Sequence, residues 1–294
     1  MPDPSAGLTV GAALRSAATA LASSPTAMPT AMLDARVLAK AAFALDDTGL
    51  VLQEHRALAD NERAAYEGMI ARRIAGEPVA HITGIREFWS LPIMVEPGIL
   101  VPRADSETLI AATLARRTAS GAHRVLDLGC GSGALLCALL SAMPAATGLG
   151  IDIDDRAVAL TARNLAAFGF AGRARAQTGD WAHSLAGNFD VIVSNPPYIA
   201  ETERGRLPRE VERYENAGAL FAGPDGADAL RALAAGLPGV AAPEALIALE
   251  FGTGQENTVR SLFSKAFPAA LLHIAADLAG RPRALIIDLC EPAR

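Results

Sequence analysis

Residues 194–198, "SNPPY", place a carboxamide, two prolines and a tyrosine directly after the apolar run of residues 189–193. Proline has no N–H for a sheet ladder, so the predicted strand ends at Asn195. An amide or exocyclic amine nitrogen is a weak nucleophile because its lone pair is delocalised. Acceptors that hold both of its N–H groups would orient that nitrogen and stabilise the positive charge developing on it. The Asn195 side-chain oxygen and the Pro196 carbonyl can be these acceptors, and Tyr198 can pack on the planar group.

An electrophilic methyl group on a sulfonium would complete an in-line displacement at such a nitrogen. This transfer needs no metal ion and no nucleophilic serine or cysteine. The five histidines and three cysteines show no metal-ligand spacing, so we expect no metal site. We expect Cys130, Cys137 and Cys290 to be reduced and buried. The alternative interpretation of residues 194–198 is a proline turn without a ligand.

A glycine-rich turn follows another predicted strand in residues 126–133, "LDLGCGSG". Gly129, Gly131 and Gly133 carry no Cβ that would block a ligand, and the predicted helix after them offers free N–H groups. The third glycine comes one residue too early for the dinucleotide pattern Gly-x-Gly-x-x-Gly. The turn therefore favours a ligand at this strand end, although a tight turn alone would use the same residues.

Two further strand ends carry polar or aromatic side chains. Asp152 ends the next predicted strand, where a carboxylate can accept from both hydroxyls of a ribose. Asp180 can accept from an adenine amino group, and Trp181 can cover the ring, unless the indole serves ordinary packing. An Asp at the position of Asp152 suits NAD as well as other nucleoside cofactors. These residues predict an adenosine-like ligand without identifying it.

Alternating strand and helix patterns must position these residues. The alternation over residues 105–294 predicts βαβ units, right-handed crossovers and a mostly parallel sheet. Residues 83–104 mix Gly, Pro, aromatic and β-branched residues and predict a hairpin or linker. Apolar residues three and four apart predict a helical domain over residues 1–82. Seven strands are expected in the sheet, at residues 123–129, 146–154, 173–180, 189–198, 245–252, 270–277 and 283–289.

The composition of the 294 residues limits the partners. A net charge of −6 argues against tight non-specific nucleic-acid binding, which depends on Lys and Arg at phosphates. Every apolar stretch is interrupted before the roughly 18 residues that a membrane span needs. The N-terminus has no basic leading segment and carries Asp3 and Arg15, which argues against a secretory signal. We expect a cytoplasmic protein without a membrane or a stable nucleic-acid partner.

The ordered motifs resemble the S-adenosylmethionine-dependent methyltransferases of the HemK type, and within them the release factor glutamine methyltransferases. The likeness runs from about Arg72 to the C-terminus and includes "GEPVAHITGIREFW", "LVPRADSETLI", "VLDLGCGSGALL", "SNPPYI", "ALEFGTGQ" and "DLAGRPRALI". It implies an α/β fold with a seven-stranded class I methyltransferase (Rossmann-like) sheet behind a small N-terminal helical domain. It also implies S-adenosyl-L-methionine as cofactor. The implied substrate is the Gly-Gly-Gln loop of bacterial class I peptide chain release factors, methylated at the glutamine side-chain nitrogen N5.

Residue types and resemblance together give a set of expected site residues. The chain departs from the family at "PRADSE", where Pro-Arg-Pro-Glu/Asp-Thr-Glu is common, and at Asn216, where Pro is common. Both departures leave the local loop geometry open. We assign cofactor binding to Gly129, Cys130, Gly131, Ser132, Gly133, Asp152, Asp180, Trp181 and Asn195, substrate binding to Asn195, Pro196, Pro197 and Tyr198, and catalysis to Asn195, Pro196 and Tyr198.

Four other functions stay open at this point. A glutamine methyltransferase acting on a ribosomal protein has closely similar motifs, although "DSETLI" and "DLAGRPR" favour the release factor group. An adenine-N6 DNA methyltransferase would need a DNA-reading region, for which the acidic chain offers no obvious candidate. A nicotinamide oxidoreductase leaves residues 195–198 without a role. An inactive cofactor-binding scaffold is disfavoured by the intact Asn195.

Overall fold

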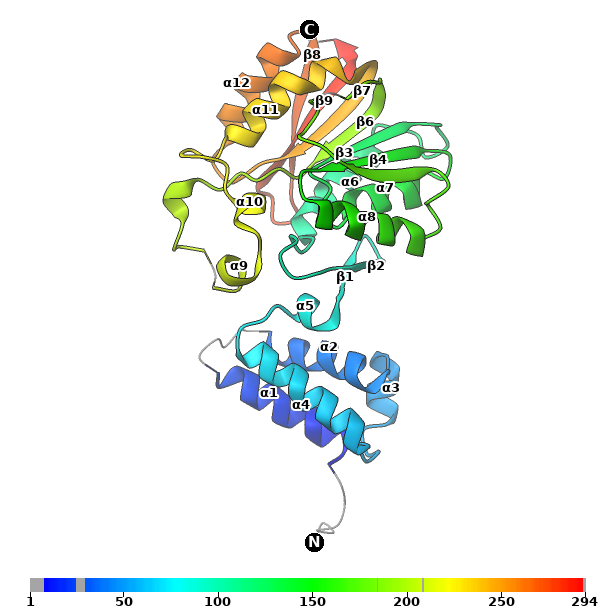
Figure 1. The fold of residues 1–294 in the computed structure, drawn as a ribbon, viewed down its shortest axis with the longest axis vertical. Helices are drawn as coiled ribbons and strands as arrows, with labels where there is room; N and C mark the ends of the chain where they lie inside the picture. Colours follow the sequence, from blue (N-terminus) through cyan, green and yellow to red (C-terminus); the bar gives the residue numbers. More distant parts are fainter. Residues whose placement is uncertain (1–7, 25–29, 184, 208, 293–294) are drawn as a thin grey trace. The chain divides into compact units, whose positions relative to one another are not determined.

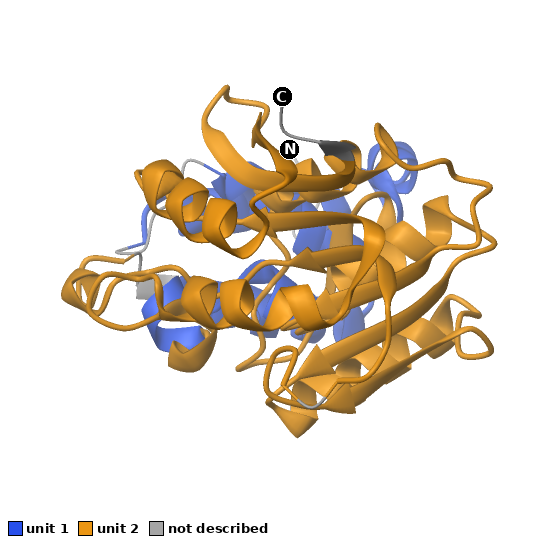
Figure 2. Ribbon diagram, turned by 90° about the horizontal axis from the view of Figure 1, so that it is seen from above, with its two compact units in different colours: residues 1–84, 208–214 blue, residues 85–207, 215–294 orange. Residues whose placement is uncertain are grey.

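The computed structural model describes residues 8–24, 30–183, 185–207 and 209–292. The chain divides into two compact units, one of residues 1–84 and 208–214 and the other of residues 85–207 and 215–294. Figure 2 shows the first unit in blue and the second in orange. Asp3, on which the expectation about a secretory signal partly rests, lies outside the described residues.

The smaller unit is helical, as the apolar spacing predicts. Its first helix begins after Thr9, whose side chain accepts a hydrogen bond from the Ala12 N–H. Arg73 and Asp34 form a buried ion pair at 2.7 Å inside the helical core. One short helix of this unit comes from much later in the chain. The helices are α1 (Val10–Ala22), α2 (Ala31–Phe43), α3 (Asp47–Leu52), α4 (Asp60–Ile74), α5 (Val79–Thr83) and the late α9 (Arg209–Tyr214).

The larger unit opens with the predicted hairpin. Strands β1 (Ile85–Phe88) and β2 (Leu91–Met94) pair antiparallel around a turn of two residues. Trp89 and Ser90 in that turn have φ angles of 50° and 60°, which match the twist of two-residue hairpins. The Glu107 carboxylate accepts the Trp89 N–H at 2.9 Å and holds the turn in this conformation.

The main element is a seven-stranded sheet in the order β5-β4-β3-β6-β7-β9-β8 (Figure 1). Neighbouring strands run parallel except β9, which is antiparallel to both β7 and β8. The predicted seven strands and the class I methyltransferase architecture are thereby confirmed. The strands are β3 (Arg124–Leu128), β4 (Thr147–Asp152), β5 (Ala174–Thr178), β6 (Phe189–Ser194), β7 (Ala241–Glu250), β8 (Ala270–Ala276) and β9 (Pro282–Pro292).

Alternate strand residues supply two separate cores on the two faces of the sheet. On β3, Val125 joins the core under one set of helices, and its neighbour Leu126 joins the core under the other. Figure 1 shows α6, α7 and α8 over one face and α11 and α12 over the opposite face. The helices of the larger unit, including the short α10, are α6 (Glu107–Leu114), α7 (Ala134–Ala142), α8 (Asp155–Ala167), α10 (Ala217–Leu220), α11 (Asp228–Gly236) and α12 (Glu256–Ala266). Its 3-10 turns are η1 (Ala104–Ser106), η2 (Glu201–Glu203) and η3 (Leu237–Gly239).

The strand order reverses its direction between β3 and β6. The chain proceeds outward from β3 through β4 to β5, and then returns to place β6 on the other side of β3. In open α/β sheets, the crevice at the carboxyl ends of the strands beside such a reversal is the usual ligand position. The glycine loop leaves β3 and residues 195–198 leave β6, so both lie at this crevice.

The structure tests the expectations about membrane-spanning segments and about the burial of the three cysteines. Within the described ranges, no helix combines the length and apolar character required to cross a bilayer. Cys130 and Cys137 are buried, but Cys290 is exposed, so the prediction that all three are buried was wrong. Cys290 lies near the end of β9, between Asp288 and Pro292, where the pairing with β8 shifts register.

Candidate active site

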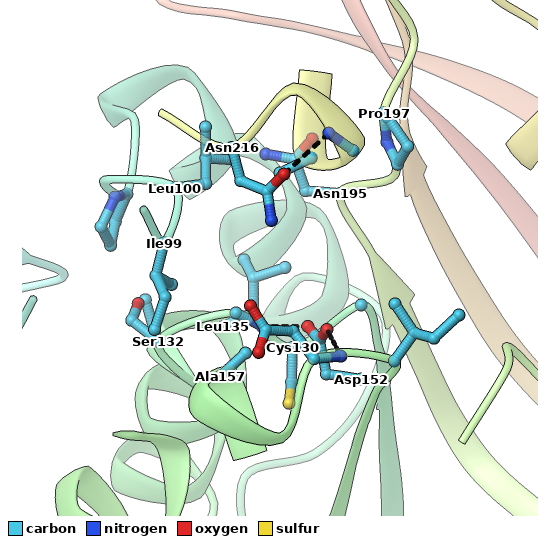
Figure 3. Close-up of a pocket in the computed structure, with 18 of the residues that line it drawn as sticks. Ile99, Leu100, Cys130, Ser132, Leu135, Asp152, Ala157, Asn195, Pro197 and Asn216 are labelled. Atoms are coloured by element: carbon cyan, nitrogen blue, oxygen red, sulfur yellow. Dashed lines mark hydrogen bonds between the residues drawn. The ribbon is translucent and has the colours of Figure 1, made fainter. Parts of the chain in front are cut away.

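The carboxyl ends of β3, β4, β5 and β6 open onto one cavity of about 420 Å³. Figure 3 shows Asn195 and Pro197 on one side of it and Cys130 and Asp152 on the opposite side. All of its walls belong to the larger unit. The lining residues are Phe88, Gly98, Ile99, Leu100, Pro102, Ser106, Gly129, Cys130, Gly131, Ser132, Ala134, Leu135, Asp152, Ile153, Asp154, Ala157, Gly179, Asp180, Trp181, Asn195, Pro197, Asn216, Gly218 and Ala219.

The glycine loop between β3 and α7 requires glycine for two physical reasons. Gly129, Gly131 and Gly133 have φ angles of 71°, 55° and 76°, a region that other residues rarely adopt. A Cβ on Gly133 would also come within 2.8 Å of the Thr161 methyl group. The loop can therefore lie flat against α8 and turn its other side to the cavity.

Two buried side chains of helix α8 donate hydrogen bonds to the glycine loop. The Thr161 hydroxyl donates to the Gly131 carbonyl at 3.0 Å. The Asn164 amide donates to the Ser132 carbonyl at 2.8 Å and to the Met94 carbonyl at 3.0 Å. Its oxygen accepts the Met94 N–H at 2.9 Å. Asn164 thus ties the loop to the end of the β1–β2 hairpin.

Asp152 at the end of β4 is bonded to the glycine loop. Its Oδ2 accepts the Gly131 N–H at 2.8 Å and its Oδ1 accepts the Asp154 N–H at 3.0 Å. Burial raises the pKa of Asp152, and these two N–H groups counteract part of the rise. The carboxylate has about four acceptor positions, so acceptor capacity remains for a ligand in the cavity.

Asp180 and Trp181 follow β5 and lie at the edge of the same cavity. The Asp180 side chain is 58% exposed. Trp181 is half-buried and has a φ of 49°, uncommon for a residue other than glycine. Its ring lies 3.4 Å from the position that a Cβ on Gly129 would take. The indole therefore flanks the glycine loop as well as packing on the core.

The Asn195 side chain is held by a chain of buried polar groups. Its Nδ2 donates to the Ser106 hydroxyl at 3.0 Å, and that hydroxyl donates to Glu250 Oε2 at 2.5 Å. The Tyr198 hydroxyl donates to the other Glu250 oxygen at 3.2 Å. Burial raises the pKa of Glu250, and the Ser106 hydroxyl and nearby Arg283 counteract part of the rise. Burial and Glu250 also raise the pKa of Tyr198, whose phenol stays protonated.

The backbone around Tyr198 is fixed from the β7–α12 loop. Gln255 donates to the Tyr198 carbonyl at 3.0 Å and to the Gly226 carbonyl at 3.1 Å, while its oxygen accepts the Gly252 N–H. A Cβ on Gly226 would lie 2.4 Å from the Tyr198 carbonyl oxygen. The motifs "GPDG" and "EFGTGQ" therefore support residues 195–198.

The structure brings most of the expected site residues to one cavity, with three exceptions. Gly133 faces Thr161, Pro196 is buried, and the Tyr198 hydroxyl points to Glu250, so none of these three lines the cavity. The residues that do line it are Gly129, Cys130, Gly131, Ser132, Asp152, Asp180, Trp181, Asn195 and Pro197. Burial raises the pKa of the Cys130 thiol, which stays protonated and unreactive.

Sequence reasoning missed several residues that shape the site. Ser106 and Glu250 hold Asn195, and Ile99 and Leu100 form an apolar wall opposite the strand ends. Glu250 ends an apolar strand as Asp152 does, so the criterion that found Asp152 applies to it as well. Ser106 gave no comparable signal, since it precedes Asn195 by 89 positions and no periodicity links them.

Comparisons with known proteins bear on the fold and the family of this chain. A family model described as the PrmC N-terminal domain matches residues 12–84, and one described as the Methyltransferase small domain matches residues 103–209. A solved methyltransferase from Pyrococcus furiosus shares the fold, with a TM-score of 0.50 and 16% identity over 76% of this chain and 98% of that chain.

Two curated relatives cover most of the chain. The release factor glutamine methyltransferase of Rhodospirillum rubrum is 43% identical over 253 residues, which are 86% of this chain and 77% of that protein. The release factor glutamine methyltransferase of Bradyrhizobium diazoefficiens is 40% identical over 286 residues, 96% of each chain. Identity at this level over nearly the whole length leads to one conclusion: the chain belongs to the family of release factor glutamine methyltransferases.

Proposed function

We propose that this protein transfers a methyl group from S-adenosylmethionine to the side-chain nitrogen N5 of the glutamine in the Gly-Gly-Gln loop of a bacterial peptide chain release factor. The relatives' names supply the reaction and the class of acceptor. Translation terminates in the cytoplasm, so we infer that the enzyme acts there. The observation that carries the proposal is the Asn195 carboxamide, held in the wall of the same cavity as the glycine loop.

The residues of the cavity fit a sulfonium nucleoside. Gly129 and Gly131 place no Cβ between the loop backbone and the cavity, the remaining acceptor capacity of Asp152 suits the ribose hydroxyls, and Trp181 suits one face of the adenine. S-adenosylmethionine, when bound, supplies an electrophilic methyl group and leaves as S-adenosylhomocysteine.

The chain's own contribution is to orient a weak nucleophile. With Asn195 Oδ1 accepting one of its N–H groups and the Pro196 carbonyl the other, the glutamine nitrogen would face the methyl carbon. Of these two acceptor residues, Asn195 lines the cavity and Pro196 is buried directly behind it in sequence. The nitrogen–carbon bond forms as the carbon–sulfur bond breaks, and the nitrogen then loses one proton to solvent. Both acceptors stabilise the positive charge on the nitrogen before that proton leaves. The rigid residues Pro196 and Pro197 keep the acceptors in place.

Asn195→Ala tests this role. We expect methyl transfer to fall by on the order of 10²–10³-fold, the cost of removing one preorganised electrostatic partner, while S-adenosylmethionine still binds. Asn195→Asp keeps an acceptor oxygen and should retain more activity than the alanine variant. Asn257→Ala changes an exposed residue of α12 and is the matched control.

Mass spectrometry of the acceptor decides the substrate. Release factor and ribosomal proteins are incubated separately with enzyme and S-adenosylmethionine and then digested. We expect a methyl group on the glutamine of the Gly-Gly-Gln loop. A methyl group on a ribosomal protein and never on this loop would replace the proposed acceptor, and full activity of Asn195→Ala would overturn the mechanism.

A further inference from the structure

Ser106 occupies an unusual position for a residue outside the glycine loop and residues 195–198. It is 3% exposed and lies between the Asn195 amide and the Glu250 carboxylate, bonded to both. It belongs to η1, a short turn just before α6, and reaches β6 and β7 only through the tertiary fold. Glu250 is 1% exposed and accepts from both Ser106 and Tyr198.

Counting protons fixes the direction of each hydrogen bond in this chain. A serine hydroxyl has one proton, and here both Glu250 oxygens act as acceptors, Oε2 from the Ser106 hydroxyl and Oε1 from the Tyr198 hydroxyl. The short Ser106–Glu250 contact therefore uses the serine proton, which leaves only lone pairs on Ser106 for Asn195. The Asn195 atom that meets Ser106 must then be the donor, Nδ2. The amide oxygen, Oδ1, is turned away from Ser106.

We infer that Ser106, with its proton committed to Glu250, is a positioning residue that selects the active one of the two orientations of the Asn195 carboxamide. A carboxamide turned by 180° has nearly the same shape but exchanges acceptor for donor. Only the orientation with Nδ2 on Ser106 leaves Oδ1 to accept an N–H group of the substrate amide. The inference rests on the proposed function, in which Asn195 accepts from a glutamine.

Ser106→Ala removes the selecting group and leaves Asn195 in place. We expect the kcat of methyl transfer to fall roughly tenfold, the factor that one hydrogen bond of ordinary net strength represents. The Kd of S-adenosylmethionine and the KM of the release factor should change less than about twofold, because the Ser106 hydroxyl is only 3% exposed and its hydrogen bonds go to Asn195 and Glu250. Ser106→Thr keeps the hydroxyl and should recover most of the rate.

A double variant separates orientation from general stability. Combined with Asn195→Ala, the Ser106→Ala change should cost no further activity, because no carboxamide remains to be oriented. Thr113→Val removes another fully buried hydroxyl, on α6, and should leave kcat unchanged. Thermal unfolding of each variant checks that it is folded at the assay temperature.

The possible results are distinct. Undiminished kcat for Ser106→Ala, or an equal loss in the presence and absence of Asn195, would overturn the inference while leaving the proposed function intact. A failure of Ser106→Thr to exceed Ser106→Ala would also count against it. A wild-type protein that methylates no release factor would overturn the proposed function and this inference together.

Discussion

Asp152 has two roles in the site, and replacing this one residue tests both without changing the other site residues. Its carboxylate holds the glycine loop through the Gly131 N–H and has acceptor positions left for a ribose. We expect Asp152→Ala to weaken S-adenosylmethionine binding by about 1.5–3 kcal/mol, the range for hydrogen bonds to charged groups. Titration calorimetry measures this. Asp46→Ala removes a carboxylate that likewise accepts a backbone N–H, but in the helical unit, and is the control. Equal affinity of Asp152→Ala and wild type would refute the assignment.

Asp127 on β3, unlike Asp152, is a fully buried carboxyl beside the glycine loop. Burial raises its pKa to about 7. The Leu136 N–H offsets part of the rise, although within the described residues neither carboxylate oxygen has a hydrogen bond of good geometry. Between about pH 4 and pH 7, the Asp127 carboxyl therefore keeps its proton in the folded protein but has lost it in the unfolded chain. Stability from this group falls as pH rises from about 4 to about 7 and is constant above.

Asp127→Asn should remove that pH dependence. Because the amide is never charged, we expect the variant to be more stable than the wild type at pH 8, by on the order of a few kcal/mol. The difference should shrink as the pH approaches 4. Urea unfolding of both proteins at several pH values measures it. A difference in unfolding free energy that does not vary with pH would show that Asp127 is not the titrating group.

Residue types predicted much of the site because polar side chains at strand ends stand out from apolar strands. Asp152, Asp180, Trp181 and Asn195 were found this way, and all line the cavity. Ser106 could not be found, since its partners come from two strands that follow it at long range. The inward turn of the Tyr198 hydroxyl also depends on Glu250, which lies 52 positions away.

Among the elements, α8 contributes most to the shape of the glycine loop. Asn164→Ala should destabilise the protein by about 2–4 kcal/mol, because it leaves the buried Ser132 carbonyl and the partly buried N–H and carbonyl of Met94 without their partner. We also expect weaker S-adenosylmethionine binding, since the loop is no longer tied to the hairpin. Urea unfolding and calorimetry measure the two effects, with exposed Asn257→Ala as the reference. An Asn164→Ala protein of wild-type stability would mean that the loop holds its shape unaided.

The existence of the strands was easier to predict than their arrangement. Apolar runs bounded by Gly, Pro and charge marked six of the seven strands, and the alternation of strands and helices marked β5, whose sequence ARAQT is not apolar. The antiparallel β9 and its place between β7 and β8 depend on pairing between segments that local patterns do not record. The hydrogen bond between the Glu107 side chain and the hairpin turn is a further tertiary feature without a local signal.

For the whole molecule, ligand choice distinguishes the proposed function from a nicotinamide oxidoreductase. A ligand that binds only the folded state stabilises it by about 2.7 kcal/mol at 100 times its Kd. We expect S-adenosylmethionine to raise the Tm and NAD at equal concentration to leave it unchanged. Differential scanning calorimetry with each ligand tests this. A Tm that rises with NAD alone would favour the oxidoreductase.

The division into residues 1–82, 83–104 and 105–294 stays a prediction, but the compact units follow a different course along the chain. The helical unit takes residues 1–84 and then a second segment, residues 208–214, that contains α9. Proximity in sequence predicted the first segment, because its helices share one continuous apolar pattern. It gave no reason to assign α9 to that unit, since a short helix between two strands reads as part of the sheet domain.

The membership of α9 in the helical unit bears on how the two parts can be inherited or exchanged. The chain passes between the units at residues 84–85, 207–208 and 214–215, so no single cut separates them. A chimera that receives a relative's residues 1–84 would combine foreign helices with a native α9. Substitutions in α9 and in the N-terminal helices are therefore expected to accumulate together among relatives, and a functional graft should include residues 208–214.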